Sequence, residues 1–170
     1  MSKTKKPLSV LTLAMAGMMA AMVFVATYFL KLPVPMTSGY VHLGDAFVLI
    51  GAGLLGPIAI PAAALGSMLA DVLMGYSVYA IPTLLCKGLV AYVVVLGNRF
   101  KSLWAQLGLM VLAEMCMVAV YFACEATLLG YGLGGALANV TGNLVQGASG
   151  VVIAAVLLPA LKRAKLPLGK

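Results

Sequence analysis

Ionisable side chains lie inside stretches of this sequence that are otherwise almost wholly apolar. They are Asp71, Lys87, Glu114 and Glu125. An ionisable group within a lipid bilayer costs several kcal/mol unless protein surrounds and pairs it, so each of these residues is a candidate functional group. Further along the chain, Asn139, Asn143 and Gln146 follow helical spacing, which would place three amides on one helix face. Together, such groups could hold a small polar ligand in an apolar pocket.

The composition indicates that these residues belong to an integral membrane protein. The chain has 170 residues, of which 64% are hydrophobic and 9% are charged, whereas about a quarter of the residues of a soluble domain are charged. At ~20 residues per spanning helix, this length allows about five to seven spans and leaves no room for a soluble ATPase domain. Any energy source must therefore come from another chain.

The apolar stretches predict a single all-α domain with six transmembrane helices. Gly56-Pro57 divides the stretch 46–74, which is long for one helix and short for two. Gly-Pro is a strong turn signal, and proline suits the first turn of a new helix. The glycine-rich stretch 130–135 predicts a turn before the last span. Within the domain 1–170, the expected spans are about 8–30, 45–55, 57–74, 80–96, 103–129 and 136–161.

Basic residues predict the orientation of these spans. The net charge of +7 comes mostly from three clusters at the ends of apolar stretches. The clusters are Lys3, Lys5 and Lys6; Arg99 and Lys101; and Lys162, Arg163, Lys165 and Lys170. Cytoplasmic loops carry the excess of Lys and Arg, and six spans place all three clusters inside, with both termini cytoplasmic. Five spans would put the two basic ends on opposite sides. The charge thus indicates a lipid bilayer as partner, with no nucleic acid.

This orientation gathers polar groups near the outer side of the membrane. At ~1.5 Å per residue, Asp71, Lys87 and Glu125 all lie in the outer halves of their spans. The loops above them carry histidine and tyrosine. We therefore expect a pocket open to the outside, with these substrate-binding residues: Tyr40, His42, Tyr76, Tyr79, Lys87, Glu125, Asn139, Asn143 and Gln146.

Structural roles remain open for several of these residues. Asp71 and Lys87 could form an ion pair with each other, and the amides could hydrogen-bond between helices. The tyrosines could belong to an interfacial aromatic belt, and His42 could serve the outer loop as a hydrogen-bonding group. Asp45 directly precedes a span and is expected to be its N-cap. Glu114 receives no role. The residues assigned structural roles are Asp45, Gly56, Pro57 and Asp71.

The first span carries small residues at helical spacing. They are Ala16, Gly17, Ala20 and Ala21, which form the pairs Ala16-xxx-Ala20 and Gly17-xxx-Ala21. Small residues let helices approach one another closely within lipid. This face would suit docking against another membrane subunit.

Catalytic chemistry finds little support in the sequence. Gly147-Ala148-Ser149-Gly150 matches the serine motif of rhomboid proteases, but the sole histidine, His42, lies towards the opposite side of the membrane. A phosphate loop, a His-Glu-x-x-His motif and an acidic metal cluster are all missing from the sequence. We therefore expect a protein that is not an enzyme and that uses neither a metal nor a cofactor.

Four short motifs follow one another along the chain. They are Gly39-Tyr40-Val41-His42-Leu43-Gly44-Asp45-Ala46, Gly56-Pro57, Ser67-Met68-Leu69-Ala70-Asp71-Val72-Leu73-Met74-Gly75-Tyr76 and Lys87-Gly88-Leu89. In this order the series resembles the substrate-binding S components of energy-coupling factor (ECF) transporters. The nearest branch is that of the riboflavin-type carriers, which includes pyridoxine and hydroxymethylpyrimidine carriers.

The resemblance implies a six-helix protein of a prokaryotic plasma membrane that captures a vitamin from outside. It would work with a membrane T component and two cytoplasmic ATPase subunits. In the family, an Ala-xxx-Ala helix faces the T component, and Ala16 and Ala20 occupy that place. The family pocket, built from the first loop and helices 4 to 6, overlaps the outer polar cluster. A lysine with a glutamate suits a B6 vitamer or the pyrimidine of thiamin, and riboflavin is the next candidate.

Two functions of other classes remain compatible with the residues. A non-transporting membrane scaffold would use its small-residue faces to bind partner helices, and replacing Lys87, Glu125 and Asn143 would leave its function intact. An autonomous secondary carrier would transport its substrate in cells that lack the ATPase and T subunits.

Overall fold

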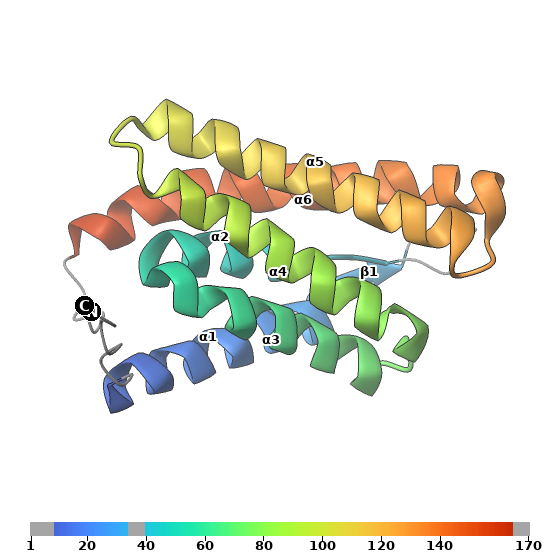
Figure 1. Ribbon diagram of the computed structural model, residues 1–170, viewed down its shortest axis with the longest axis horizontal. Helices are drawn as coiled ribbons and strands as arrows, with labels where there is room; N and C mark the ends of the chain where they lie inside the picture. Colours follow the sequence, from blue (N-terminus) through green and yellow to red (C-terminus); the bar gives the residue numbers. More distant parts are fainter. Residues whose placement is uncertain (1–8, 34–39, 165–170) are drawn as a thin grey trace, which may run out of the picture.

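The computed structural model describes residues 9–33 and 40–164. Predictions that concern Lys3, Lys5, Lys6, Gly39, Lys165 and Lys170 lie outside these residues. In chain order, the described elements are α1 (Val10–Phe29), β1 (Lys31–Pro33), β2 (Tyr40–His42), α2 (Gly44–Leu55), η1 (Gly56–Ile58), α3 (Ala59–Leu73), η2 (Ser77–Tyr79), α4 (Ala80–Gly97), α5 (Leu103–Thr127) and α6 (Gly132–Arg163). The helices follow the long axis of the molecule, and successive helices alternate in direction (Figure 1).

The local sequence explains where helices begin and end. The Ser9 hydroxyl caps α1 by accepting a hydrogen bond from the Thr12 backbone N–H at 3.1 Å. Between α2 and α3, Gly56 has φ +67°, a left-handed conformation that glycine adopts without steric cost. Pro57 follows in the first turn of η1. The chain therefore turns at the predicted Gly56-Pro57 position.

Two local features differ from the sequence-based expectation. The stretch 130–135 was expected to be a turn throughout, but α6 already begins at Gly132. Each helical glycine costs only about 1 kcal/mol relative to alanine, which packing against α5 can offset. The connection between α1 and α2 contains a short antiparallel hairpin, in which Lys31 pairs with His42 and Leu32 with Val41. Strands of three residues are too short to show a detectable alternation in sequence.

Five stretches of the described chain are long and apolar enough to cross a membrane. They are Val10–Phe29, Gly44–Leu73, Ser77–Gly97, Leu103–Thr127 and Gly132–Arg163, and α2 and α3 together make up the second. Large apolar side chains such as Leu13, Leu69, Leu85 and Val152 are exposed on the outside of the bundle. A surface of this kind is suited to lipid rather than to water.

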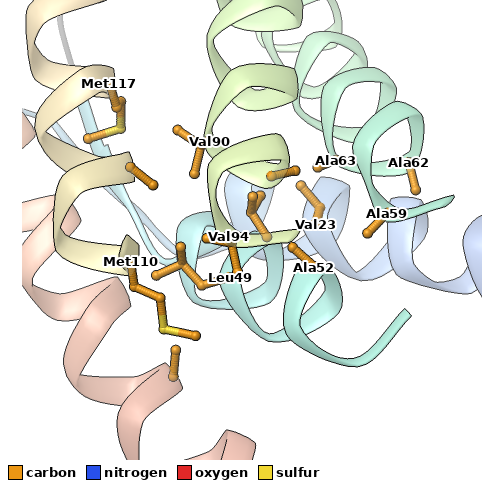
Figure 2. Close-up of a cluster of buried hydrophobic side chains, with 14 of the residues drawn as sticks. Val23, Leu49, Ala52, Ala59, Ala62, Ala63, Val90, Val94, Met110 and Met117 are labelled. Atoms are coloured by element: carbon orange, nitrogen blue, oxygen red, sulfur yellow. The ribbon is translucent and has the colours of Figure 1, made fainter. Parts of the chain in front are cut away.

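Apolar side chains from several helices fill the centre of the bundle. Leu49 on α2 lies among Val90 and Val94 on α4 and Met110 and Met117 on α5 (Figure 2). Small buried residues let α2 and α3 pack closely against neighbouring helices. On these two helices they include the alanines Ala52, Ala59, Ala62 and Ala63.

The two ends of the bundle differ in chemistry. The start of α1, the end of α6 and the α2–α3 and α4–α5 turns lie at one end (Figure 1). Basic residues of the described chain, Arg99, Lys101, Lys162 and Arg163, belong to this basic end. The β1–β2 hairpin and the α3–α4 and α5–α6 turns lie at the other end, which we call the hairpin end.

Candidate ligand-binding site

A pocket lies at the hairpin end, where β2 meets α3, α4, α5 and α6. It encloses about 450 Å³ of atom-free space including its open mouth. Its lining residues are Tyr40, Asp71, Tyr79, Thr83, Tyr121, Glu125, Asn139, Gly142, Asn143 and Gln146. Aromatic rings with a few convergent polar groups are the usual lining of a small-molecule site.

The structure brings together most of the side chains that the sequence singled out for substrate binding. Those on the pocket wall are Tyr40, Tyr79, Glu125, Asn139, Asn143 and Gln146. His42, Tyr76 and Lys87 do not line the pocket, although each contacts groups around it. The polar side chains expected to form one cluster therefore lie near one another, but some line the pocket and others lie behind its wall.

Glu125 is the centre of one polar group on the wall. Its Oε1 atom accepts hydrogen bonds from the Tyr79 hydroxyl and the Asn139 side-chain amide, both at 3.0 Å. These contacts join α5 to η2 and α6. The Oε2 atom is buried and has no hydrogen-bond partner among the described residues. Glu125 thus keeps one carboxylate oxygen available to a ligand.

Asp71 forms a second polar group with Tyr40. The Tyr40 hydroxyl donates a hydrogen bond to Asp71 Oδ1, which ties the hairpin to α3. Burial, together with the charge of Asp71, raises the pKa of the Tyr40 phenol above its ordinary value, so Tyr40 remains a donor. Asp71 Oδ2 is buried without a hydrogen-bond partner in the described chain. Asp71, assigned a structural role from sequence, therefore also belongs to the pocket wall.

A fully buried ion pair joins Lys87 to Asp45. The ammonium nitrogen of Lys87 lies 2.5 Å from Asp45 Oδ1, and both side chains have 0% exposure. Lys87 also lies 3.0 Å from the sulfur of Met117, and Asp45 Oδ2 accepts a 2.7 Å hydrogen bond from the Gln146 amide. Neither Lys87 nor Asp45 lines the pocket, and we call this buried pair the sealed layer.

The ion pair corrects two sequence-based interpretations. Lys87 pairs with Asp45 and not with Asp71. Asp45 is also not the N-cap of α2: Leu43 holds that position and makes no side-chain capping bond. A capping bond contributes about 1 kcal/mol, whereas leaving a buried lysine unpaired costs several times as much. The need to neutralise Lys87 therefore outweighs the cap.

His42 connects the hairpin to this ion pair. Its backbone N–H donates to the Gln146 side-chain oxygen at 3.1 Å, and its ring Nδ1 accepts from the Gly44 backbone N–H at 3.0 Å. Burial lowers the pKa of His42 to about 4, so the ring is neutral near pH 7. His42 is thus a buried hydrogen-bonding group that fixes the hairpin on α2 and α6.

Aromatic rings and a lysine cover the hairpin side of the site. The ammonium nitrogen of Lys31 lies 5.5 Å from the ring centroid of Tyr28, 6.0 Å from that of Tyr40 and 5.9 Å from that of Tyr76. The rings of Tyr40 and Tyr76 pack at 4.8 Å. These are cation–π distances, so the rings of Tyr28, Tyr40 and Tyr76 already attract a positive charge.

Three lining residues escaped the sequence reasoning, namely Thr83, Tyr121 and Gly142. Helical spacing could have found two of them, because Tyr121 lies four residues before Glu125 and Gly142 lies three residues after Asn139. The Thr83 and Tyr121 hydroxyls share a 2.9 Å hydrogen bond.

The small residues of α1 divide into two groups. Ala16 is buried, and Ala20 is half-buried with its backbone against Gly66 of α3. Gly17 and Ala21 are exposed. The Gly17-xxx-Ala21 pair therefore remains available to a partner, whereas the Ala16-xxx-Ala20 pair serves internal packing.

Glu114 is buried deeper in the bundle, and both of its carboxylate oxygens are without hydrogen-bond partners among the described residues. It packs against Gly147, where an added Cβ would lie 2.9 Å from the Glu114 Cβ. Glu114 does not line the pocket.

Comparison with known proteins identifies the family to which this chain belongs. Residues 7–163 match the family described as "ECF-type riboflavin transporter, S component". The chain is 34% identical over 143 residues to a Pyrococcus woesei protein described as "Uncharacterized protein in gap 3'region", covering 83% of this chain and 95% of that protein.

Two solved structures share the fold. One, described as "Structure and mechanism of the S component of a bacterial ECF transporter", has a TM-score of 0.75 and 20% identity over 90% of this chain and 96% of its own. The S component for biotin from an ECF-type ABC transporter has a TM-score of 0.66 and 18% identity over 97% of this chain and 94% of its own. From its sequence match over almost its whole length, this chain belongs to the family of S components of ECF-type riboflavin transporters.

Proposed function

We propose that this chain captures a water-soluble vitamin or vitamin precursor for an ATP-driven uptake transporter. The observation that carries the proposal is the pocket, in which tyrosine rings, carboxyl groups and amides converge at one end of an apolar bundle. Membership of the S-component family supports this role. A B6 vitamer or the pyrimidine of thiamin is the favoured ligand because the pocket is small, and riboflavin is the next candidate.

In this proposal the protein lies in a prokaryotic plasma membrane with six spans, and α2 and α3 each cross it. Both termini are cytoplasmic, because the basic end of the bundle carries Arg99, Lys101, Lys162 and Arg163. The hairpin end and its pocket then face the outside. A membrane T component and two cytoplasmic ATPase subunits supply the energy for transport.

The proposed ligand contacts are the pocket-wall residues Tyr40, Tyr79, Glu125, Asn139, Asn143 and Gln146. His42 and Lys87 act indirectly in this assignment: the His42 backbone holds Gln146 on the pocket wall, and Lys87 pairs with Asp45, which in turn accepts a hydrogen bond from Gln146. Tyr76 supports the ring of Tyr40.

A ligand screen tests the proposed function. The purified full-length protein is expected to bind at least one of the B6 vitamers, thiamin, its pyrimidine or riboflavin with a Kd in the nanomolar to micromolar range. At a ligand concentration of 100 times Kd, binding raises the free energy of unfolding by about 2.7 kcal/mol, which a thermal shift detects. If no vitamin binds, the capture function is wrong and the scaffold function is favoured. Uptake that persists in cells without the ATPase and T subunits would instead indicate an autonomous carrier.

The exposed small residues of α1 are the proposed contact with the T component. Gly17→Trp and Ala21→Trp are expected to weaken binding of the T component about 5- to 150-fold, measured as reduced co-purification, since a clash at a packed interface costs ~1–3 kcal/mol. Ligand binding should remain unchanged, because an added Cβ at Gly17 meets nothing within 4 Å. Ala16→Trp is the contrasting control, because Ala16 is only 8% exposed and tryptophan there should disrupt the bundle itself. Loss of ligand binding in Gly17→Trp would refute the assignment.

A further inference from the structure

The pocket contains buried oxygen acceptors that lack partners. They are Asp71 Oδ2, Glu125 Oε2 and Asn139 Oδ1, and none has a hydrogen-bond partner among the described residues. All three belong to lining residues. A buried acceptor without a donor costs about 1–3 kcal/mol. A ligand that donates hydrogen bonds would therefore remove a penalty that the protein alone carries.

Most of the donors near these acceptors are already engaged. The Tyr40 hydroxyl donates to Asp71 Oδ1, and the Asn139 amide and Tyr79 hydroxyl both donate to Glu125 Oε1. Thr83 lies beside Asp71 and shares a hydrogen bond with the Tyr121 hydroxyl, in which either oxygen can be the donor. Asn143, half-buried on the wall, is the flexible exception because its amide can donate or accept. The wall thus offers mainly acceptors to an incoming molecule.

The charge of the pocket points in the same direction. The described lining residues include two carboxyl groups, Asp71 and Glu125, and no Lys, Arg or His. Lys87 presents no ammonium group to the pocket, because its side chain is 0% exposed, pairs with Asp45 and does not line the pocket. The exposed Lys31 at the hairpin end already lies over the rings of Tyr28, Tyr40 and Tyr76. An anion entering this site would meet carboxylates without a neutralising partner.

Building on the capture function above, we propose that the ligand is a small nitrogen heteroaromatic base that carries an amino group. Its amino and protonated ring N–H groups donate to Glu125, Asp71 and Asn139. Its ring packs on Tyr79 and Tyr121, whose own rings lie 6.2 Å apart. Carboxylated and phosphorylated relatives of the same ring are rejected. This arrangement favours an aminopyrimidine or an aminomethylpyridine over a flavin.

Matched ligand pairs test this inference on the unaltered full-length protein in detergent. The first pair is 4-amino-5-hydroxymethyl-2-methylpyrimidine and its 4-hydroxy analogue, and the second is pyridoxamine and 4-pyridoxic acid. By isothermal titration calorimetry, the amino member of at least one pair is expected to bind about 10- to 100-fold more tightly, because hydrogen bonds to charged groups contribute ~1.5–3 kcal/mol. Riboflavin serves as a neutral ligand without an amino group.

Substitution of the carboxyl groups tests which residues carry the selectivity. Glu125→Gln is expected to weaken binding of the amino compound about 10- to 100-fold and to shrink its preference over the matched analogue. Glu114→Gln is the control, because it makes the same change in a buried residue of the same helix that does not line the pocket. Thermal unfolding identifies variants that fail to fold, and Asp71→Asn provides a second variant.

The outcomes separate this inference from the proposed function. If riboflavin binds and neither amino compound does, or if in neither pair the amino compound binds more tightly than its matched analogue, the inference is overturned while vitamin capture stands. Equal selectivity in Glu125→Gln, Asp71→Asn and the unaltered protein would also overturn it. If no vitamin of any class binds, the capture function fails and the inference fails with it.

Discussion

Lys87→Met is expected to lower the free energy of unfolding by about 3–5 kcal/mol. The substitution leaves the Asp45 carboxylate at 0% exposure without its cation, and among the described residues the carboxylate keeps only the Gln146 amide as a hydrogen-bond donor. Thermal and denaturant unfolding of the purified protein in detergent measure the loss. Because Gln146 also binds the hairpin through the His42 backbone, we expect the pocket to loosen with the core.

The double variant Lys87→Met with Asp45→Asn separates pairing from packing. Removing both charges of a buried ion pair is often neutral or stabilising, so the double variant should recover most of the lost stability. Lys101→Met is the matched control, because Lys101 is exposed and the change should be within about 0.5 kcal/mol. If Lys87→Met unfolds like the unaltered protein, or if the double variant is no more stable than the single one, the ion pair does not stabilise the bundle in this way.

Gly66→Ala is expected to destabilise the bundle by about 1–3 kcal/mol, although it adds one methyl group. The new Cβ would lie 2.5 Å from the carbonyl oxygen of Ala20 and 3.1 Å from its Cα. Both atoms belong to the backbone of α1, so the clash cannot be relieved by rotating a side chain. The helices α1 and α3 must move apart, which the unfolding midpoint and the yield of folded protein should report.

Gly108→Ala provides the control for this second substitution. Gly108 lies in α5, and an added Cβ there meets nothing within 4 Å. Alanine is favoured over glycine in a helix by about 1 kcal/mol, so this variant should be as stable as the unaltered protein or slightly more stable. Equal destabilisation by both substitutions would contradict a specific α1–α3 contact.

Polar periodicity predicted much of the candidate site because helices repeat regularly. Residues at i, i+4 and i+7 share a helix face, so Asn139 and Gln146 could be assigned to one wall from spacing alone. The same rule, applied to α5, would have added Tyr121 to Glu125. Spacing does not show the direction in which each helix face points. Lys87 was therefore also assigned to the pocket, whereas in the structure it is fully buried, pairs with Asp45 and does not line the pocket.

The partner of Lys87 was decided by the tertiary structure. Sequence places Asp71 and Lys87 at similar depths on consecutive helices, and depth is a single coordinate along the helix axis. The rotation of each helix decides which side chains meet, and Asp45, 42 residues before Lys87, is the carboxylate that α2 turns towards α4. Asp71 instead faces Tyr40 and the pocket.

The sequence by itself determined the membrane character of the chain, the positions of its helices and the α2–α3 turn. Hydrophobicity, charge and the conformational limits of glycine and proline are local properties, so neighbouring residues suffice to define them. Only the tertiary structure decided the β1–β2 hairpin, the Lys87–Asp45 ion pair and the division of polar residues into a pocket wall and a sealed layer. These features join residues far apart in the chain, and the packing of whole helices brings them together.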